Sequence, residues 1–135
     1  MLPTTLTVTT ANSLQTRLPT YTYRLNLLDK RIYGFTDKID AMVQALNKIA
    51  ETERFAWIIY SAHYGIELES LLGQSMVFVE AVIEQRIREA FLADDRVVSI
   101  ENFSTERQDT ESLIVSCRVH TIHGEIDFSK ELTLQ

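Results

Sequence analysis

The chain has 135 residues, which is enough for one domain with a sizeable apolar core. Apolar residues make up 45% and charged residues 24%, an ordinary globular composition that argues against a wholly disordered chain. The net charge of −6 argues against nucleic-acid binding, no apolar run approaches the roughly 20 residues of a membrane span, and the first residues lack the pattern of a signal peptide.

Residues 1–20 differ from the rest, with many threonines, few large apolar side chains and no clear period. We interpret them as an extended N-terminal arm that orders only against a partner, followed by a single domain over residues 21–135. The domain is predicted to begin with a strand over residues 21–27, where Tyr and Leu alternate with polar residues. A second short strand is expected at residues 30–34.

Two amphipathic helices are predicted next. Thr36 is a plausible N-cap for a helix from about Asp37 to Glu51, whose apolar residues recur at helical spacing. Ser75 can cap a second helix from about Met76 to Leu92. The apolar stripe of this second helix is formed by Met76, Val79, Ile83, Ile87 and Ala90.

The segment between the helices is less regular. Residues 55–60 form an aromatic and aliphatic run that is too short to classify. Residues 67–72 predict a helix of one or two turns, ended by Gly73 as a left-handed cap.

The last third is predicted to be a three-stranded antiparallel meander. Its strands cover residues 97–103, 113–121 and 125–134, with a polar loop at residues 105–111 and a tight turn ending at Gly124.

The apolar positions of the third strand change phase near Ser129, which predicts a β-bulge. The meander has one apolar face that needs a helical layer, and the two amphipathic helices supply it. The predicted fold class is therefore α+β, in two layers, with the helices packed on the meander and with an N-terminal strand and extended arm.

Arg86 is the charge whose position is hardest to explain as a solvated side chain. It lies at the flank of the apolar stripe of the second helix, where a guanidinium needs a carboxylate or carbonyl partner. Glu53 and Glu67 are the candidate partners. We interpret Arg86 and Glu67 as an internal structural ion pair, and the alternative is an interface pair that fixes the docking of a partner.

Glu53 and Arg54 come just after the first helix and directly before Phe55-Ala56-Trp57. A charged corner beside aromatic side chains can anchor a helix of a neighbouring protein through stacking and bidentate contacts. The partner-binding candidates are thus Glu53, Arg54, Phe55 and Trp57. The alternative is a solvated corner between helix and loop.

Catalytic and metal-binding chemistry have little support in the sequence. Cys117 is in phase with the apolar residues of a predicted strand, so we expect an inert buried thiol. His63 and Glu67 are four residues apart, but one histidine and one carboxylate are too few ligands for a metal. The spacing of the 19 acids singles out no pair of carboxylates for a glycosidase, and no phosphate loop or nucleophile elbow is present. We therefore predict a protein that is not an enzyme and has no cofactor or metal.

A series of motifs carries a resemblance to a known family. In chain order they are Ala45-Leu46-Asn47-Lys48-Ile49, Thr52-Glu53-Arg54, Tyr64-Gly65-Ile66-Glu67-Leu68, Leu72-Gly73, Ile83-Glu84-Gln85-Arg86-Ile87-Arg88-Glu89-Ala90 and Asp94-Asp95-Arg96-Val97. Over about residues 21–134 this order resembles the XkdS-type phage tail proteins. These are similar to the lysozyme-like baseplate wedge proteins of contractile phage tails and to the TssE-like component of type VI secretion baseplates.

The resemblance implies a structural component of the baseplate wedge of a contractile phage or phage-tail-like particle, present in the virion and assembled in the host cytoplasm. The implied partners are the baseplate J-like wedge protein, met through a helical core bundle, and the tail sheath protein, with tube or hub proteins as further partners. No nucleic acid or membrane is implied. The family motif after the first helix is often Glu-Pro-Arg or Gly-Glu-Arg. Because Thr52-Glu53-Arg54 holds that place, the wedge-contact role falls on Glu53 and Arg54, while the departure at Thr52 leaves the local turn open.

The resemblance also implies how the sheath is met. Sheath subunits exchange terminal strands, so an edge of the meander or the terminal arms are expected to imitate a sheath subunit by β-augmentation. Two other functions stay open at the level of sequence. One is a tail-associated, peptidoglycan-cleaving, lysozyme-like domain, and the other is a small adaptor or tail-completion protein elsewhere in the tail.

Overall fold

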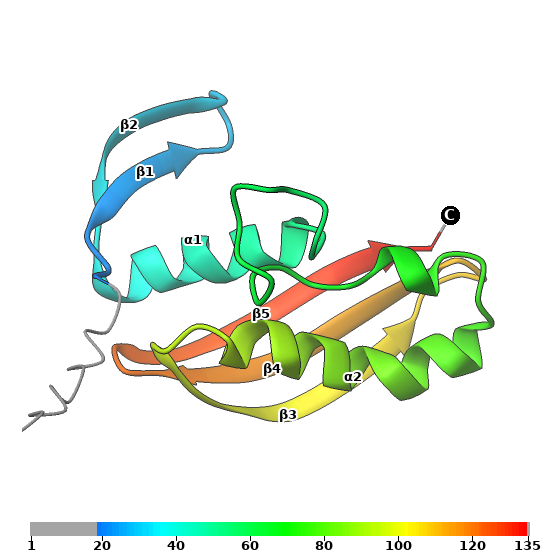
Figure 1. The fold of residues 1–135 in the computed structure, drawn as a ribbon. Coiled ribbons are helices and arrows are strands. Elements are labelled where there is room, and N and C mark those ends of the chain that lie inside the picture. Colours follow the sequence, from blue (N-terminus) through cyan, green and yellow to red (C-terminus); the bar gives the residue numbers. More distant parts are fainter. Residues whose placement is uncertain (1–18, 135) are drawn as a thin grey trace, which may run out of the picture.

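The computed structural model describes residues 19–134, which form an α+β fold in agreement with the predicted class. The elements are β1 (Thr22–Asn26), β2 (Arg31–Thr36), α1 (Lys38–Glu51), the 3₁₀ helix η1 (Glu69–Leu71), α2 (Met76–Leu92), β3 (Val97–Arg107), β4 (Ser112–Thr121) and β5 (Gly124–Thr133). The last three strands form an antiparallel meander in the order β3-β4-β5, and β1 and β2 form a separate antiparallel hairpin. Figure 1 shows the hairpin rising from the start of α1, away from the meander.

The predicted arm falls almost entirely outside the described residues, of which only Pro19 and Thr20 belong to it. In the described part of the chain, neither helix is long and apolar enough to cross a membrane.

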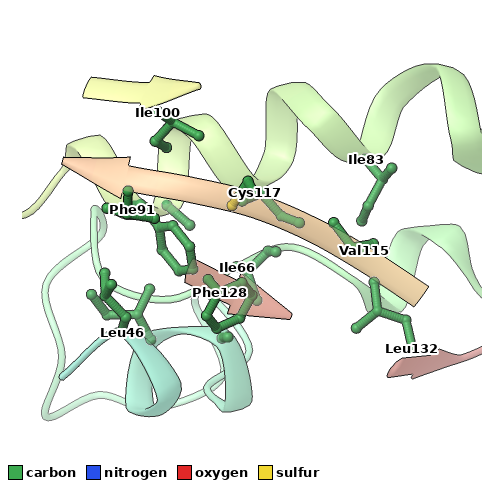
Figure 2. Close-up of a cluster of buried hydrophobic side chains, with 14 of the residues drawn as sticks. Leu46, Ile66, Ile83, Phe91, Ile100, Val115, Cys117, Phe128 and Leu132 are labelled. Atoms are coloured by element: carbon green, nitrogen blue, oxygen red, sulfur yellow. The ribbon is translucent and has the colours of Figure 1, made fainter. Parts of the chain in front are cut away.

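The core lies between the two helices and the inward face of the meander. Figure 2 shows side chains from α1, α2, the segment before η1 and all three strands meeting there, including Leu46, Ile66, Ile83, Phe91, Ile100, Val115, Cys117, Phe128 and Leu132. The ring of Phe91 meets that of Phe128 edge-on, with centroids 4.9 Å apart. Cys117 is buried on β4 as predicted, and its burial raises the pKa of the thiol to about 11.

The two helix starts differ in how well the sequence predicted them. Ser75 caps α2 as expected, because its Oγ accepts a hydrogen bond from the N–H of Phe78 at 3.4 Å. The prediction that Thr36 caps α1 is wrong. Thr36 is buried at the end of β2, where it pairs with Thr22. Asp37 is the N-cap, and its carboxylate accepts from the N–H of Lys38 at 2.7 Å.

The meander corrects two further predictions. β3 continues to Arg107 and so includes part of the predicted polar loop. The bulge predicted near Ser129 is wrong, because every residue of β5 faces one residue of β4. Lys130 takes the inward position between Phe128 and Leu132, and its Nζ donates to the carbonyl of Ala50 at the end of α1 at 3.2 Å. The apparent change of phase is thus a lysine in an apolar row.

A buried ion pair holds the joint between α2 and β3. The Nε and Nη2 atoms of Arg96 donate to the two carboxylate oxygens of Asp94 at 2.9 and 2.7 Å, and Nη1 donates to the carbonyl of Pro19 at 3.1 Å. Burial favours a higher pKa for Asp94, but the hydrogen bonds from Arg96 outweigh it and lower the pKa below the usual 3.8. The pair therefore joins the start of the described chain to the α2–β3 joint.

Asp94→Asn should destabilise the fold by about 3 kcal/mol at pH 7, because it leaves the buried guanidinium of Arg96 without its counter-charge. A folded-state pKa below 3.8 means that this contribution is present above pH 4 and is lost as the pH falls through the folded value. Urea unfolding of both proteins should thus give free energies of unfolding that converge at acid pH. Asp127→Asn, which breaks the exposed pair with Arg118, is the control and should have little effect. A difference that persists unchanged at pH 2.5 would contradict this account.

Candidate functional site

The segment after α1 forms a closed loop over residues 54–65, called the braced loop below. A short parallel bridge between Glu53 and Ile66 closes its base. The N–H of Arg54 donates to the carbonyl of Ile66 at 3.0 Å, and the N–H of Ile66 donates to the carbonyl of Thr52 at 2.9 Å. Because Ile66 is buried in the core, the bridge attaches both ends of the loop to the body of the domain.

Gly65 makes this close approach of the two backbones possible. Its φ is +97°, and a Cβ at this position would lie 2.6 Å from the carbonyl oxygen of Thr52 and 3.1 Å from the nitrogen of Arg54. A side chain would therefore meet backbone atoms that cannot swing aside. Glycine is the residue that allows the bridge to form.

Glu53 points back into the domain. Its carboxylate accepts hydrogen bonds from the N–H of Leu68 at 3.0 and 3.1 Å and from the N–H of Glu69 at 3.2 Å, at the start of η1. The side chain satisfies backbone donors that would otherwise lack a partner at the beginning of a helical turn. Glu53 is thus an internal cap for the segment that follows the loop.

Arg54 and Arg86 share the carboxylate of Glu67. Nη1 of Arg54 lies 3.4 Å from Oε1 of Glu67, and Nη1 of Arg86 forms an ion pair and hydrogen bond with Oε2. Nε of Arg54 also donates to the carbonyl of Ala62 inside the loop at 2.7 Å. The Arg54–Glu67–Arg86 chain thus connects the loop to α2.

The first half of the braced loop, residues 55–59 and called its exposed end below, is largely apolar. Phe55 and Trp57 are 65% and 59% exposed, Ile59 is 84% exposed and Ile58 is fully exposed. The Arg54 guanidinium lies 4.8 Å from the ring centroid of Phe55. Consecutive large apolar side chains in solvent are typical of a protein interaction site.

The structure separates the four predicted partner-binding residues into two pairs. Glu53 and Arg54 hold the base of the loop through internal bonds, whereas Phe55 and Trp57 lie exposed on the loop itself. Sequence reasoning missed Ile58, Ile59 and Gly65. The signal for the two isoleucines was present in the apolar run at residues 55–60, which fits neither a helical nor an alternating period.

A second exposed feature is the outer edge of β5. Thr121 and Gly124 flank the two-residue turn between β4 and β5, and the two residues that flank such a turn form a hydrogen-bonded pair. From there on, hydrogen-bonded and non-hydrogen-bonded pairs alternate along the ladder. In the non-hydrogen-bonded pairs the β5 residue points its backbone N–H and C=O groups away from β4. These residues are Glu125, Asp127, Ser129, Glu131 and Thr133. Within residues 19–134 no other strand pairs with this edge, and its exposed side chains are mainly acidic.

One groove, beside α1, offers little for catalysis. It has a volume of about 330 Å³ and lies among α1, the braced loop and the α2–β3 joint, lined in part by Lys48, His63, Tyr64 and Arg96. Among its described lining residues Asp94 is the one acid, and Arg96 engages it. The pair of carboxylates that glycoside hydrolysis requires is thus absent from the described lining.

Comparison with known proteins gives two matches. A family model described as "Contractile injection system sheath initiator" matches residues 17–124, which is most of the chain. The "Phage-like element PBSX protein XkdS" of Bacillus subtilis (strain 168) is 28% identical over 113 residues, which cover 81% of this chain and 79% of the relative. The family match spans α1, the braced loop and α2. The match to the relative covers 81% of the chain, which is enough to span the same elements.

Gly65→Ala should destabilise the domain by about 3 kcal/mol, because the new Cβ combines a positive φ with a backbone clash. Gly73→Ala is the matched control, since Gly73 also has a positive φ of +76° but open space around it, and it should cost about 1 kcal/mol. Urea unfolding and hydrogen exchange at the Ile66 amide provide the measurements. Equal effects of the two substitutions would show that the close approach at the base of the loop is unimportant.

Proposed function

The chain belongs to the contractile injection system sheath initiator family, and we propose that it docks on the baseplate J-like wedge protein through the exposed end of the braced loop. As a member of this family it is a structural baseplate component of a phage-like contractile tail particle, where it initiates sheath assembly and so meets sheath and baseplate components. The proposal concerns which surface meets which partner.

The observation that carries the proposal is the contrast within the braced loop. Its base is fixed by the backbone bridge, by Glu53 and by the Arg54–Glu67–Arg86 chain, whereas its end leaves Phe55, Trp57 and two isoleucines in solvent. A pre-organised apolar loop loses little conformational entropy on binding, and aromatic residues are frequent hot spots. Such a loop fits the hydrophobic groove between helices that a helical core bundle offers. In this proposal Glu53 and Arg54 contribute to wedge contact by holding the loop.

We further propose that the sheath protein adds an extended strand to the outer edge of β5. The edge is regular and unpaired among the described residues, which favours strand addition. Its exposed side chains include Glu125, Asp127 and Glu131, while the opposite face of β5 is apolar. The favoured strand would thus alternate basic or polar residues with apolar ones. The basic residues of such a strand would complement the negative charge of the β5 edge.

Trp57→Ala should weaken binding to the purified wedge protein by about 30-fold, the loss expected when an aromatic hot spot is truncated. Its stability should stay close to that of the wild type, because the indole makes little contact with the core. Val77→Ala is the control, since Val77 is an apolar residue on α2 that is also well exposed, at 71% against 59% for Trp57. Biolayer interferometry would measure the affinities, and equal affinity of both variants for the wedge protein would overturn the docking proposal.

Ser129→Pro should block sheath assembly, because it removes an outward N–H from the centre of the β5 edge and adds a ring that obstructs an incoming strand. The hydrogen bonds between β4 and β5 should survive, since the Ser129 N–H points away from β4. Ser129→Ala controls for the lost hydroxyl contact with Ser116. Electron microscopy of particles should show baseplates and tubes without sheath for the proline variant. Normal sheaths with a folded proline variant would rule out this edge.

A further inference from the structure

The β1–β2 hairpin is attached to the domain in an unusual way. All of its residues except Asn26 and Thr36 are exposed, so neither face of the hairpin is buried. One face carries Tyr21, Tyr23 and Leu25, with Phe35 stacked on both tyrosines at ring-centroid distances of 5.0 and 5.1 Å. A two-stranded hairpin with no covered face has little stability of its own. Its attachment to α1 therefore has to come from somewhere other than a buried face.

Gln44 on α1 supplies that attachment through the edge of β1. Its side-chain oxygen accepts from the N–H of Leu25 at 2.9 Å, and its side-chain nitrogen donates to the carbonyl of Tyr23 at 3.0 Å. In an antiparallel ladder alternate residues point their polar groups to opposite sides, so these two groups lie on the edge away from β2. One side chain thus provides the donor and the acceptor that a neighbouring strand would provide.

The other three strand edges in the described chain carry protection of their own. β2 has an extra residue beside Arg24, where Tyr33 and Gly34 oppose it and Gly34 has a positive φ. β3 has register shifts after Val97 and after Glu101. The β5 edge is lined by acids. Bulges and charged side chains are known devices against unwanted strand pairing. The ladder shows no such bulge within β1, whose centre is covered by Gln44.

We propose that Gln44 guards the outer edge of β1 against pairing with a second copy of this chain and thereby keeps the hairpin standing on α1. A second copy is the natural occupant, because two β1 edges related by a two-fold axis are self-complementary. Their pairing would join the two faces that carry Tyr21, Tyr23 and Leu25 into one apolar face of a four-stranded sheet. The guard is independent of how the baseplate and sheath are bound.

The test compares two variants that introduce the same side chain on the same helix. Gln44→Met removes both hydrogen bonds, and Asn47→Met places the same apolar group on an exposed position one turn away. For Gln44→Met, at a protein concentration low enough to keep it monomeric, hydrogen exchange at the Leu25 amide should become about fivefold faster while the Arg24 amide, which faces β2, is unchanged. Sedimentation velocity should show at least a tenfold tighter self-association for Gln44→Met than for Asn47→Met.

A double variant separates pairing through β1 from unspecific aggregation. In Gln44→Met/Leu25→Lys a two-fold pairing would bring like charges together at the edge, so the protein should return to monomer. The proposal is overturned if the Leu25 amide exchanges as in the wild type, if Gln44→Met stays monomeric, or if the double variant still dimerises. None of these readouts depends on sheath or wedge binding, so their failure leaves the proposed function untouched.

Discussion

The short bridge between Glu53 and Ile66 is the contact on which the arrangement of the middle of the chain depends. It fixes where α1 ends, closes the braced loop and sets Glu67 between two arginines. Two backbone hydrogen bonds alone would contribute little in water, because each one replaces bonds to solvent. Here they are joined to a buried side chain, Ile66, and to a glycine that permits the close approach. The bridge is stable because the apolar core holds one side of it.

Charged residues in this protein serve mainly to hold joints between elements. Asp94 and Arg96 hold the α2–β3 joint, Glu67 links the loop to α2, and Lys130 reaches the Ala50 carbonyl and the Glu51 carboxylate at the end of α1. Each of these side chains carries more than one bond, which offsets the cost of partial burial. Most of the acidic charge that remains is on the surface, notably along β5. A part fixed within a large assembly benefits from rigid joints, because a loop presented in one conformation binds with less loss of entropy.

The sequence predicted the elements whose residues follow a clean period. β4 alternates regularly, and α2 has a capping serine and a full apolar stripe, so both were located well. The errors arose where a polar residue occupies a structural position. Lys130 in an apolar row resembles a change of phase, and Asp37 rather than the neighbouring Thr36 caps α1. At the candidate site the sequence indicated that Glu53 and Arg54 lie at a joint, but it could not give the direction of their side chains. That direction depends on Leu68 and Ala62, which become neighbours only once the loop has closed.

An assembly protein has to keep some surfaces available and others closed before its partners arrive, and the strand edges suggest how this chain separates the two. A bulge or a polar side chain from a helix closes an edge to every strand, because it removes or occupies the backbone groups. A row of carboxylates is selective, since it repels a second acidic copy and still admits a basic strand. The edge of β5 has the selective kind of protection and those of β2 and β3 have the general kind. The edge of β1 is closed by one glutamine whose two hydrogen bonds are exposed. Because solvent competes for those bonds, this closure is the weakest of the four, and the hairpin is the element whose position a partner can change at the lowest cost in free energy.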